Sequence, residues 1–279
     1  MRPGARARRG PPPLVDTPGP RRYGPGRLGR LERIGRFGPT KEARMGESAA
    51  RFCWYELMTT DTKGAEAFYR RVFGWQAKPF APGEPAYTVF SVGPDAFGGM
   101  AAIPAEGCTT GSRPCWTGYV AVDDVDAYAA KVKAAGGKVL HGPEDMPGVL
   151  RFAVVADPWG AAFNLFKGAI EKEMAPIPPG TPGHVGWHEL YAGDGTGAFD
   201  FYSALFGWTK DEAYDMGPLG LYQTFATEGA RAGGMMTKTP EMAAPFWLYY
   251  FNVEAVDAAV KSAVEAGAKV ILEPHQVPG

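Results

Sequence analysis

The sequence of 279 residues predicts an α+β protein made of two tandem domains. Two observations carry this prediction: one spacing recurs four times, and the residues around it recur in alternate units. In each unit a Trp is followed by an acid and then by a Gly at fixed distances. The four sets are Trp54–Asp61–Gly74, Trp116–Asp123–Gly136, Trp187–Asp194–Gly207 and Trp247–Glu254–Gly267. Internal repetition of this kind indicates one supersecondary unit used four times.

The first unit shows how each element is predicted. The aromatic and apolar run W-Y-E-L-M over residues 54–58 is typical of a strand. Asp61 stands where its carboxylate can accept the free N–H groups of a first helical turn, so it and the matching acids are predicted N-caps. Apolar residues at helical spacing then lead to Gly74, which favours a left-handed helix end. Strand-like segments follow at 87–92 and 99–103, so each unit is one strand, one helix and two or three strands.

A second period pairs the units into domains. The motif W-Y-E-L at Trp54 matches W-H-E-L at Trp187, and F-Y-R-R-V-F-G-W matches F-Y-S-A-L-F-G-W. A Pro-rich stretch between the pairs is typical of a stiff linker. The predicted organisation is a disordered extension at 1–44, a first domain at 50–170, a linker at 171–183 and a C-terminally truncated second domain at 184–279.

The extension differs from the rest of the chain in charge. Residues 1–44 hold eleven Arg and one Lys against three acids, and Pro and Gly interrupt any periodicity. Such a segment buries too little apolar surface to order itself. It is either a basic arm for an anionic surface or a stretch upstream of a true start at Met45. We favour the second interpretation and expect no nucleic-acid partner.

The fourth unit stops early relative to the second. The run L-E-P-H-Q-V-P-G at its end matches H-G-P-E-D-M-P-G of the second unit, after which the second unit continues through 149–166. We therefore expect a fragment with unpaired strand edges in the second domain.

The composition predicts a cytoplasmic protein without membrane contact. No apolar run is long enough to span a bilayer, and no segment resembles a signal peptide. The three Cys residues lack the spacing of a metal site, which is typical of a reducing compartment. We expect a monomer or a homodimer.

The repeated motifs resemble a known family. The paired units, the F-Y-x-x-x-F-G-W helix end and the closing D-P-W-G-A-A-F-N-L-F are similar to those of the vicinal oxygen chelate superfamily. This superfamily contains glyoxalases, bleomycin resistance proteins and extradiol dioxygenases. The two-domain form with W-x-E-L starts resembles its actinobacterial antigen or "hydroxylase" branch. The resemblance covers residues 52–279 and implies paired βαβββ units that form cupped, mainly antiparallel sheets with the helices outside.

The resemblance also implies a divalent metal in each cup. Its ligands would come from the first strand of each unit and from the last strand of the domain. Carried over to this sequence, these positions are Trp54, Trp116 or Thr117, and Asn164 in the first domain, and Trp187 and Trp247 or Leu248 in the second. Zn, Fe and Mn prefer imidazole, thiolate or carboxylate ligands. We therefore expect no metal and no other cofactor, although Glu56 and Glu189 leave a divalent metal open as an alternative.

What remains in the predicted cups is aromatic and acidic. Strand alternation places Glu56 beside Trp54, and Glu189 beside Trp187, while His188 faces away. A carboxylate enclosed by Trp has a raised pKa and can act as an acid or base, so Glu56 and Glu189 are the candidate catalytic residues. The candidate ligand-binding residues are Trp54, Trp116, Asn164, Trp187, Tyr191 and Trp247. In a simpler interpretation the four Trp residues pack the core and the two Glu residues bind backbone amides.

Three functions are compatible with these cups. The first is a metal-free protein that binds a small aromatic or cationic molecule, because aromatic walls with few polar groups suit such a ligand. The second is a glyoxalase- or hydroxylase-type enzyme that uses Glu56, Glu189 or a divalent metal. The third is a scaffold whose cups are filled by its own side chains. We favour the first.

Overall fold

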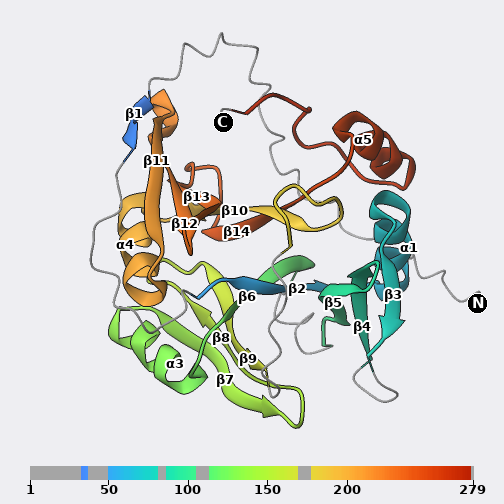
Figure 1. Cartoon of the computed structure of the whole chain (residues 1–279), viewed down its shortest axis with the longest axis horizontal. Helices are drawn as coiled ribbons and strands as arrows, with labels where there is room; N and C mark the ends of the chain where they lie inside the picture. Colours follow the sequence, from blue (N-terminus) through green and yellow to red (C-terminus); the bar gives the residue numbers. More distant parts are fainter. Residues whose placement is uncertain (1–32, 37–49, 81–85, 105–112, 169–176, 278–279) are drawn as a thin grey trace, which may run out of the picture. The chain divides into compact units, whose positions relative to one another are not determined.

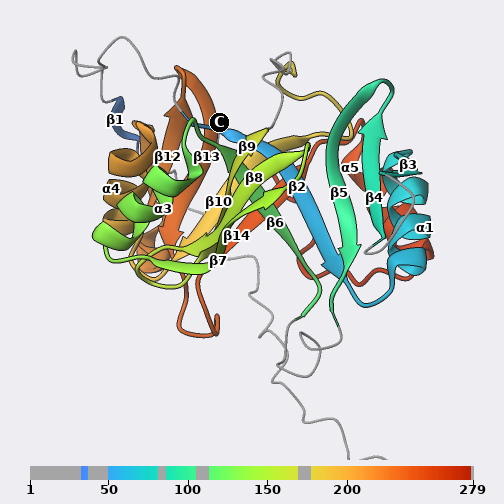
Figure 2. The same cartoon turned by 90° about the horizontal axis from the view of Figure 1, so that it is seen from below.

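The computed structural model describes residues 33–36, 50–80, 86–104, 113–168 and 177–277, which form two sheets with helices on their outer sides (Figures 1 and 2). The strand order is β3-β4-β5-β2-β6-β9-β8-β7 in one sheet and β1-β11-β12-β13-β10-β14 in the other. Neighbouring strands are antiparallel except in the pairs β2–β5, β6–β9 and β10–β13. The predicted α+β class with two tandem domains is confirmed.

The first domain contains two complete units. Its elements are β2 (Phe52–Thr59), α1 (Thr62–Phe73), β3 (Gln76–Pro79), β4 (Tyr87–Val92), β5 (Asp95–Ala102), β6 (Cys115–Ala121), α3 (Val125–Ala134), β7 (Lys138–Met146), β8 (Leu150–Ala156) and β9 (Ala162–Gly168). The antiparallel pair β2–β6 joins the two units at the middle of the sheet.

The second domain repeats this order as far as its second helix. Its elements are β10 (Val185–Ala192), α4 (Gly195–Phe206), β11 (Thr209–Asp215), the 3₁₀ helix η1 (Gly217–Leu219), β12 (Leu221–Thr227), β13 (Ala230–Thr237), β14 (Phe246–Phe251) and α5 (Val256–Glu265). β14 ends the strand order, so its outer edge has no partner among the described strands, as predicted. Within the predicted extension the structure describes only β1 (Arg33–Arg36), which pairs with β11; the rest lies outside the described residues.

The caps of the first and third units are confirmed, and those of the other two are corrected. Asp61 and Asp194 accept hydrogen bonds from the first turns of α1 and α4. Asp124 rather than Asp123 caps α3, and α5 begins after Ala255 without a side-chain cap, so Glu254 is not one. The second helix of each domain starts one residue later after its Trp than the first helix does.

The two domains share their hydrophobic core. α1 packs beside α5, and α3 packs beside α4, so each helix pair takes one helix from each domain (Figure 1). Aromatic rings cross the boundary as well: Phe251 of β14 packs against Phe73 and Trp75 of the first domain. Because the core residues form one cluster, the domains are expected to fold as one cooperative body.

A set of four matched positions lies where the two sheets meet. Tyr55 and His188 occupy the same position in their units, and the Tyr55 hydroxyl lies 2.6 Å from His188 Nε2. Since His188 Nδ1 lies 2.7 Å from the Ala232 carbonyl oxygen, which only accepts, Nδ1 carries the proton and Tyr55 donates to Nε2. Gly118 and Tyr249 form the second matched pair, and a Cβ on Gly118 would lie 2.7 Å from Tyr249 Oη. The two halves therefore fit each other through unlike residues.

No helix in the described part of the chain combines the length and the apolar character needed to span a membrane.

Candidate functional site

Strand alternation builds a polar cluster on the face of the first sheet that turns away from the helices. Trp54 pairs with Tyr119 across β2 and β6, and Glu56 pairs with Thr117, so all four side chains share this face. Asn164 of β9 stands beside Tyr119 on the same face. These residues, with Tyr87 of β4, are called the first cup.

Hydrogen bonds fix the side chains of the first cup. Trp54 Nε1 donates to the Tyr87 hydroxyl at 2.9 Å. The Tyr87 and Tyr119 hydroxyls both hydrogen-bond to the Glu56 carboxylate. Asn164 is buried, and its amide nitrogen donates to Thr117 Oγ1 at 2.9 Å. Among the described residues, the groups that hydrogen-bond to the Glu56 carboxylate are therefore the tyrosine hydroxyls of Tyr87 and Tyr119.

Burial sets the protonation of this cluster. Burial raises the pKa of Glu56, and the hydrogen bonds from Tyr87 and Tyr119 partly oppose this rise because they stabilise the carboxylate. Burial, and then the charge of Glu56, raise the pKa of both tyrosines. The hydroxyls consequently stay protonated and act as donors, while the carboxyl group of Glu56 takes up a proton at a higher pH than an exposed carboxyl group does.

The second sheet carries the same cluster at the matching positions, which we call the second cup. Trp187 Nε1 donates to the Tyr222 hydroxyl at 2.8 Å, and the Tyr250 hydroxyl donates to Glu189 Oε2 at 2.6 Å. Glu189 also hydrogen-bonds to Tyr222 and Tyr191. Burial, followed by the charge of Glu189, raises the pKa of Tyr191 to about 12. One Trp–Tyr–Glu–Tyr set thus occurs twice in the chain.

The orientation predicted for Trp116 and Trp247 is wrong. Trp116 pairs with Leu57, which faces the helices, and its Nε1 donates to the Tyr69 hydroxyl of α1 at 2.8 Å. Trp247 likewise donates to the Tyr202 hydroxyl of α4 at 3.1 Å. Thr117 and Leu248, the neighbouring residues, face the cups instead. The alignment had left these two residues open as alternatives, and a one-residue shift in a strand moves the side chain to the opposite face.

The remaining predicted residues lie as expected. Trp54, Glu56 and Asn164 come together in the first cup, and Trp187, Glu189 and Tyr191 in the second. His188 faces away from the second cup, as predicted, towards Tyr55.

Tyr87, Tyr222 and Tyr250 of the cups were not predicted from the sequence. The repeat could have indicated the first two, because Y-T-V-F in β4 and Y-Q-T-F in β12 stand at matching places before the two Gly-Gly-Met motifs. Both tyrosines lie against these glycines: a Cβ on Gly99 would meet Tyr87 at 2.2 Å, and one on Gly234 would meet Tyr222 at 2.3 Å. The glycines therefore leave room for the tyrosine rings beside the carboxylates.

The donor atoms of the cups do not fit the metal of the resembled family. Among the described residues, each cup offers one carboxylate surrounded by hydroxyl and indole groups, and the first cup also holds the Cys115 thiol. Within the ranges that the structure describes, no three His, Cys, Asp or Glu side chains come together. The positions where relatives would place ligands hold Trp54, Thr117 and Asn164, of which only the last two offer weak, neutral oxygen donors.

Comparisons with known proteins agree with this architecture. The family model described as "Glyoxalase/Bleomycin resistance protein/Dioxygenase superfamily" matches residues 51–165 and 181–279. The "Putative glyoxylase CFP32" of Mycobacterium bovis is 31% identical over 227 residues, covering 81% of this chain and 85% of that protein. The "Anthracycline biosynthesis protein DnrV" of Streptomyces peucetius is 35% identical over 241 residues, with 81% and 85% covered.

Two solved structures share the fold at low sequence identity. A mutant of 4-hydroxymandelate synthase from Streptomyces coelicolor superimposes with a TM-score of 0.55 at 15% identity, covering 79% of this chain and 76% of that one. The 2,3-dioxygenase LapB from Pseudomonas sp. KL28 superimposes with a TM-score of 0.52 at 11% identity, covering 78% and 80%. These two likenesses support the fold alone.

Proposed function

Because the chain belongs to the glyoxalase/bleomycin resistance protein/dioxygenase superfamily, we propose that it binds a small planar or cationic molecule in its cups, without the metal of its relatives. The observation that supports this most strongly is the duplicated Trp–Tyr–Glu–Tyr set. In both cups the set places a carboxylate among tyrosine hydroxyls and a Trp ring on the face that turns away from the helices, which supports a shared binding role.

The chemistry of the cups suits a cation with a flat apolar part. Trp and Tyr rings attract cations through their faces, by about 0.5–2 kcal/mol each. Glu56 and Glu189 add a carboxylate that tyrosine hydroxyls hold in place, and no Arg or Lys side chain is paired with either of them among the described ion pairs. In a partly desolvated site a fixed negative charge attracts a cation more strongly than it does in water.

The donor set supports binding without a metal. A divalent ion in the first cup would meet one carboxylate, neutral hydroxyls and the Cys115 thiol, whose pKa is raised by burial and by the charge of Glu56, and it would lack the imidazole ligands of a typical transition-metal site. The tyrosine hydroxyls are poor substitutes because their raised pKa keeps them protonated.

Isothermal titration calorimetry with two probes tests the proposal: benzyltrimethylammonium, which joins a ring to a cation, and an anthracycline, the compound class in the name of the Streptomyces relative. We expect Glu56→Gln and Trp54→Phe each to weaken binding to the first cup by about tenfold, which corresponds to about 1.4 kcal/mol. Trp116→Phe is the matched control, because this Trp lies on the opposite face of the neighbouring strand.

Two results would contradict the proposal. The first is that neither probe binds at millimolar concentration. The second is that the purified protein contains a stoichiometric metal whose removal abolishes binding. The matching variants of the second cup, Glu189→Gln and Trp187→Phe with Trp247→Phe as control, report whether that cup binds the same probes.

A second candidate function is a glyoxalase- or hydroxylase-type enzyme. The raised pKa of Glu56 favours it, since a carboxyl group that protonates closer to neutral pH can act as a general acid or base. If a bound ligand is converted, Glu56→Gln should lower turnover much more than affinity. Equal losses of turnover and affinity would assign Glu56 to binding only.

A further inference from the structure

The two cups differ in the number of hydroxyl groups that reach their carboxylates. Among the described residues, Glu56 of the first cup receives hydrogen bonds from two hydroxyls, those of Tyr87 and Tyr119. Glu189 of the second cup receives hydrogen bonds from the hydroxyls of Tyr191, Tyr222 and Tyr250. The last two stand at positions that match the tyrosines of the first cup, so the additional hydroxyl is that of Tyr191.

This additional hydroxyl depends on one position in the first strand of each cup. Tyr191 of β10 stands two residues after Glu189, where β2 has Met58 two residues after Glu56. Burial, and then the charge of Glu189, raises the pKa of Tyr191 to about 12, so its hydroxyl keeps the proton that it donates. The thioether of Met58 has no proton to donate. A difference at one position therefore changes the number of hydrogen bonds that the carboxylate receives.

The number of hydrogen bonds already made determines how many a ligand can add. An ionised carboxylate has about four lone-pair sites on its two oxygens. Among the described residues, two hydroxyl donors leave about two of these sites open at Glu56, and three donors leave about one open at Glu189. A ligand with two N–H groups side by side therefore fits Glu56, whereas a ligand without N–H groups leaves fewer sites unpaired at Glu189.

The strands beside the carboxylates differ in polarity in the same sense. On the strand paired with that of Glu56, the first cup has the Cys115 thiol and the Thr117 hydroxyl. The matching residues of the second cup are Phe246 and Leu248. Side chains with polar atoms can pair with the N–H groups of a ligand, whereas apolar side chains favour contact with methyl groups.

Aromatic rings lie on both sides of the carboxylate in the second cup. The Tyr191 and Phe246 rings are stacked with their centroids 5.2 Å apart. Tyr250 reaches Glu189 from β14, and Tyr222 reaches it from β12 on the other side of β10. Aromatic rings that enclose a cation are the usual means by which proteins recognise quaternary ammonium groups, because the ring faces attract the charge and contact the methyl groups.

We propose that the two cups select different classes of cation, an inference that rests on the cation binding proposed above. The first cup takes an amidinium or a similar planar cation with two N–H groups side by side. The second cup takes a quaternary ammonium. The position held by Met58 in one cup and by Tyr191 in the other determines this selection, because it sets both the number of hydroxyl donors and the presence of a ring.

Charge alone does not distinguish these two classes of ligand. Both carry one positive charge, and each cup has one carboxylate among the described residues, so the direct attraction is similar in the four combinations. The difference comes from groups that are left unpaired: a quaternary ammonium leaves acceptor sites of Glu56 unused, and an amidinium brings more N–H groups than Glu189 can accept. An unpaired polar group in a partly desolvated site weakens binding by about tenfold.

Isothermal titration calorimetry of the full chain with two probes of equal charge tests this inference. Benzamidinium carries two N–H groups side by side, and benzyltrimethylammonium carries none. Glu189→Gln protein reports the first cup, and Glu56→Gln protein reports the second. We expect the first cup to bind benzamidinium about tenfold more tightly than benzyltrimethylammonium, and the second cup to show the reverse order.

Two further variants separate the hydroxyl from the ring. Tyr191→Phe removes the donor and keeps the aromatic face, so in Glu56→Gln protein it should tighten benzamidinium binding about fivefold and change benzyltrimethylammonium binding by less than about twofold. Met58→Tyr adds a hydroxyl to the first cup, so in Glu189→Gln protein it should weaken benzamidinium binding about fivefold. The second variant keeps the test decisive if the first does not fold.

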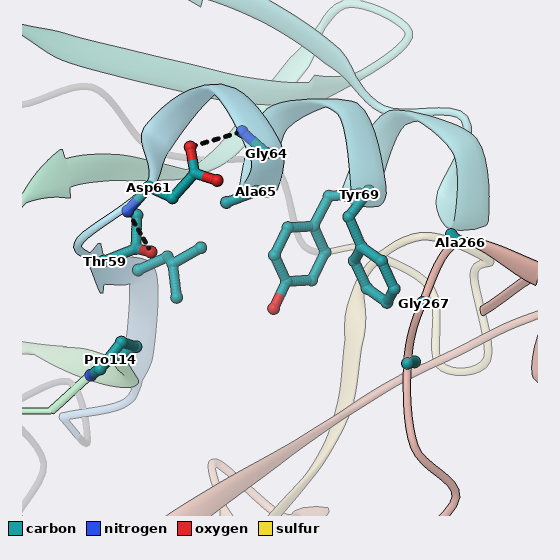
Figure 3. A pocket seen from close by; sticks show the side chains of 11 residues that line it. Thr59, Asp61, Gly64, Ala65, Tyr69, Pro114, Ala266 and Gly267 are labelled. Carbon is teal, nitrogen blue, oxygen red and sulfur yellow. Dashed lines mark hydrogen bonds between the residues drawn. The ribbon is translucent and has the colours of Figure 1, made fainter. Parts of the chain in front are cut away.

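Tyr69→Phe is the matched control. Tyr69 projects from α1 (Figure 3), and its hydroxyl accepts a hydrogen bond from Trp116 Nε1 on the helix side of the sheet, so binding of both probes should stay unchanged. Binding of both probes to each cup with affinities within about twofold of each other would overturn the inference and leave the proposed function intact. An affinity ratio that neither Tyr191→Phe nor Met58→Tyr changes would also overturn it. Failure of both probes to bind would contradict the proposed function and the inference with it.

Discussion

The burial of His188 where the two sheets meet makes the stability of this protein depend on pH. Both imidazole nitrogens are engaged, the ring stacks on Phe52 with centroids 4.5 Å apart, and Tyr249 meets its edge. No described carboxylate forms an ion pair with it. Burial therefore lowers the pKa of His188 from 6.5 to about 4, with the Ala232 carbonyl opposing the shift slightly.

The sign follows from which state binds the proton first. As the pH falls, the unfolded chain protonates near its ordinary pKa, while the folded chain keeps His188 neutral to a lower pH. This contribution to stability is complete above the unfolded value and is lost progressively as the pH falls towards the folded pKa of about 4. A shift of this size corresponds to about 3 kcal/mol in total, of which about 2 kcal/mol is lost by pH 5.

The perturbation is His188→Gln, which keeps one donor for Ala232 and one acceptor for Tyr55 but does not titrate. Urea unfolding of both proteins at about pH 7 and pH 5 gives the free energies of unfolding. We expect the original chain to lose about 2 kcal/mol more than the variant over this interval, because the other titrating groups cancel in the comparison. Parallel losses would refute the reasoning and would mean that the imidazole can be hydrated or protonated in place.

Two further predictions concern the packing around this site and the closing turn of the first domain. Gly118→Ala should lower the free energy of unfolding by about 1–3 kcal/mol, since its Cβ would lie 2.7 Å from both Phe52 and Tyr249 Oη. In a double-mutant cycle, Gly118→Ala combined with Tyr249→Phe should lower the free energy of unfolding by less than the sum of the two single changes. Asp157→Asn should cost about 1–3 kcal/mol in the same urea assay because it weakens bonds to three N–H groups and to Tyr202, whereas Asp61→Asn, on an exposed cap, should cost less than about 1 kcal/mol.

Much of the fold was predictable because the repeat contains several independent signals for the ends of each helix and strand. The caps Asp61 and Asp194 and the left-handed Gly74 and Gly207 mark the helices without tertiary context. Alternation along β10 then correctly separated the cup face from the face of His188.

The register of the second strand of each cup could not be obtained in this way. The prediction aligned the units on Asp123 as the cap of the second helix. Asp124 caps α3 instead, so this helix starts one residue later after its Trp than α1 does. Trp116 and Trp247 therefore face the helices. The tyrosines of β4 and β12 were missed because their place beside the glutamates depends on sheet pairing across a loop, which the local pattern does not specify.

The two cups share the Trp–Tyr–Glu–Tyr set but differ in the residues around it, and the residues of the second cup are the larger ones. Around Glu56 the first cup has Met58, Cys115 and Thr117 on the paired strands. Around Glu189 the second cup has Tyr191, Phe246 and Leu248 at the same positions, with the Tyr191 and Phe246 rings stacked 5.2 Å apart.

Under the proposed function, the common Trp–Tyr–Glu–Tyr set would confer a preference for a cation, and the residues that differ between the cups would select ligands by size and polarity. The unlike pairs Tyr55–His188 and Gly118–Tyr249 keep the two halves in one fixed pairing. A pairing of two first domains would place Gly118 against Gly118 and leave a void, whereas two second domains would force Tyr249 against Tyr249. The observed pairing of a first domain with a second domain therefore gives every molecule one copy of each cup. With one copy of each, the residues around the shared set can differ between the two cups.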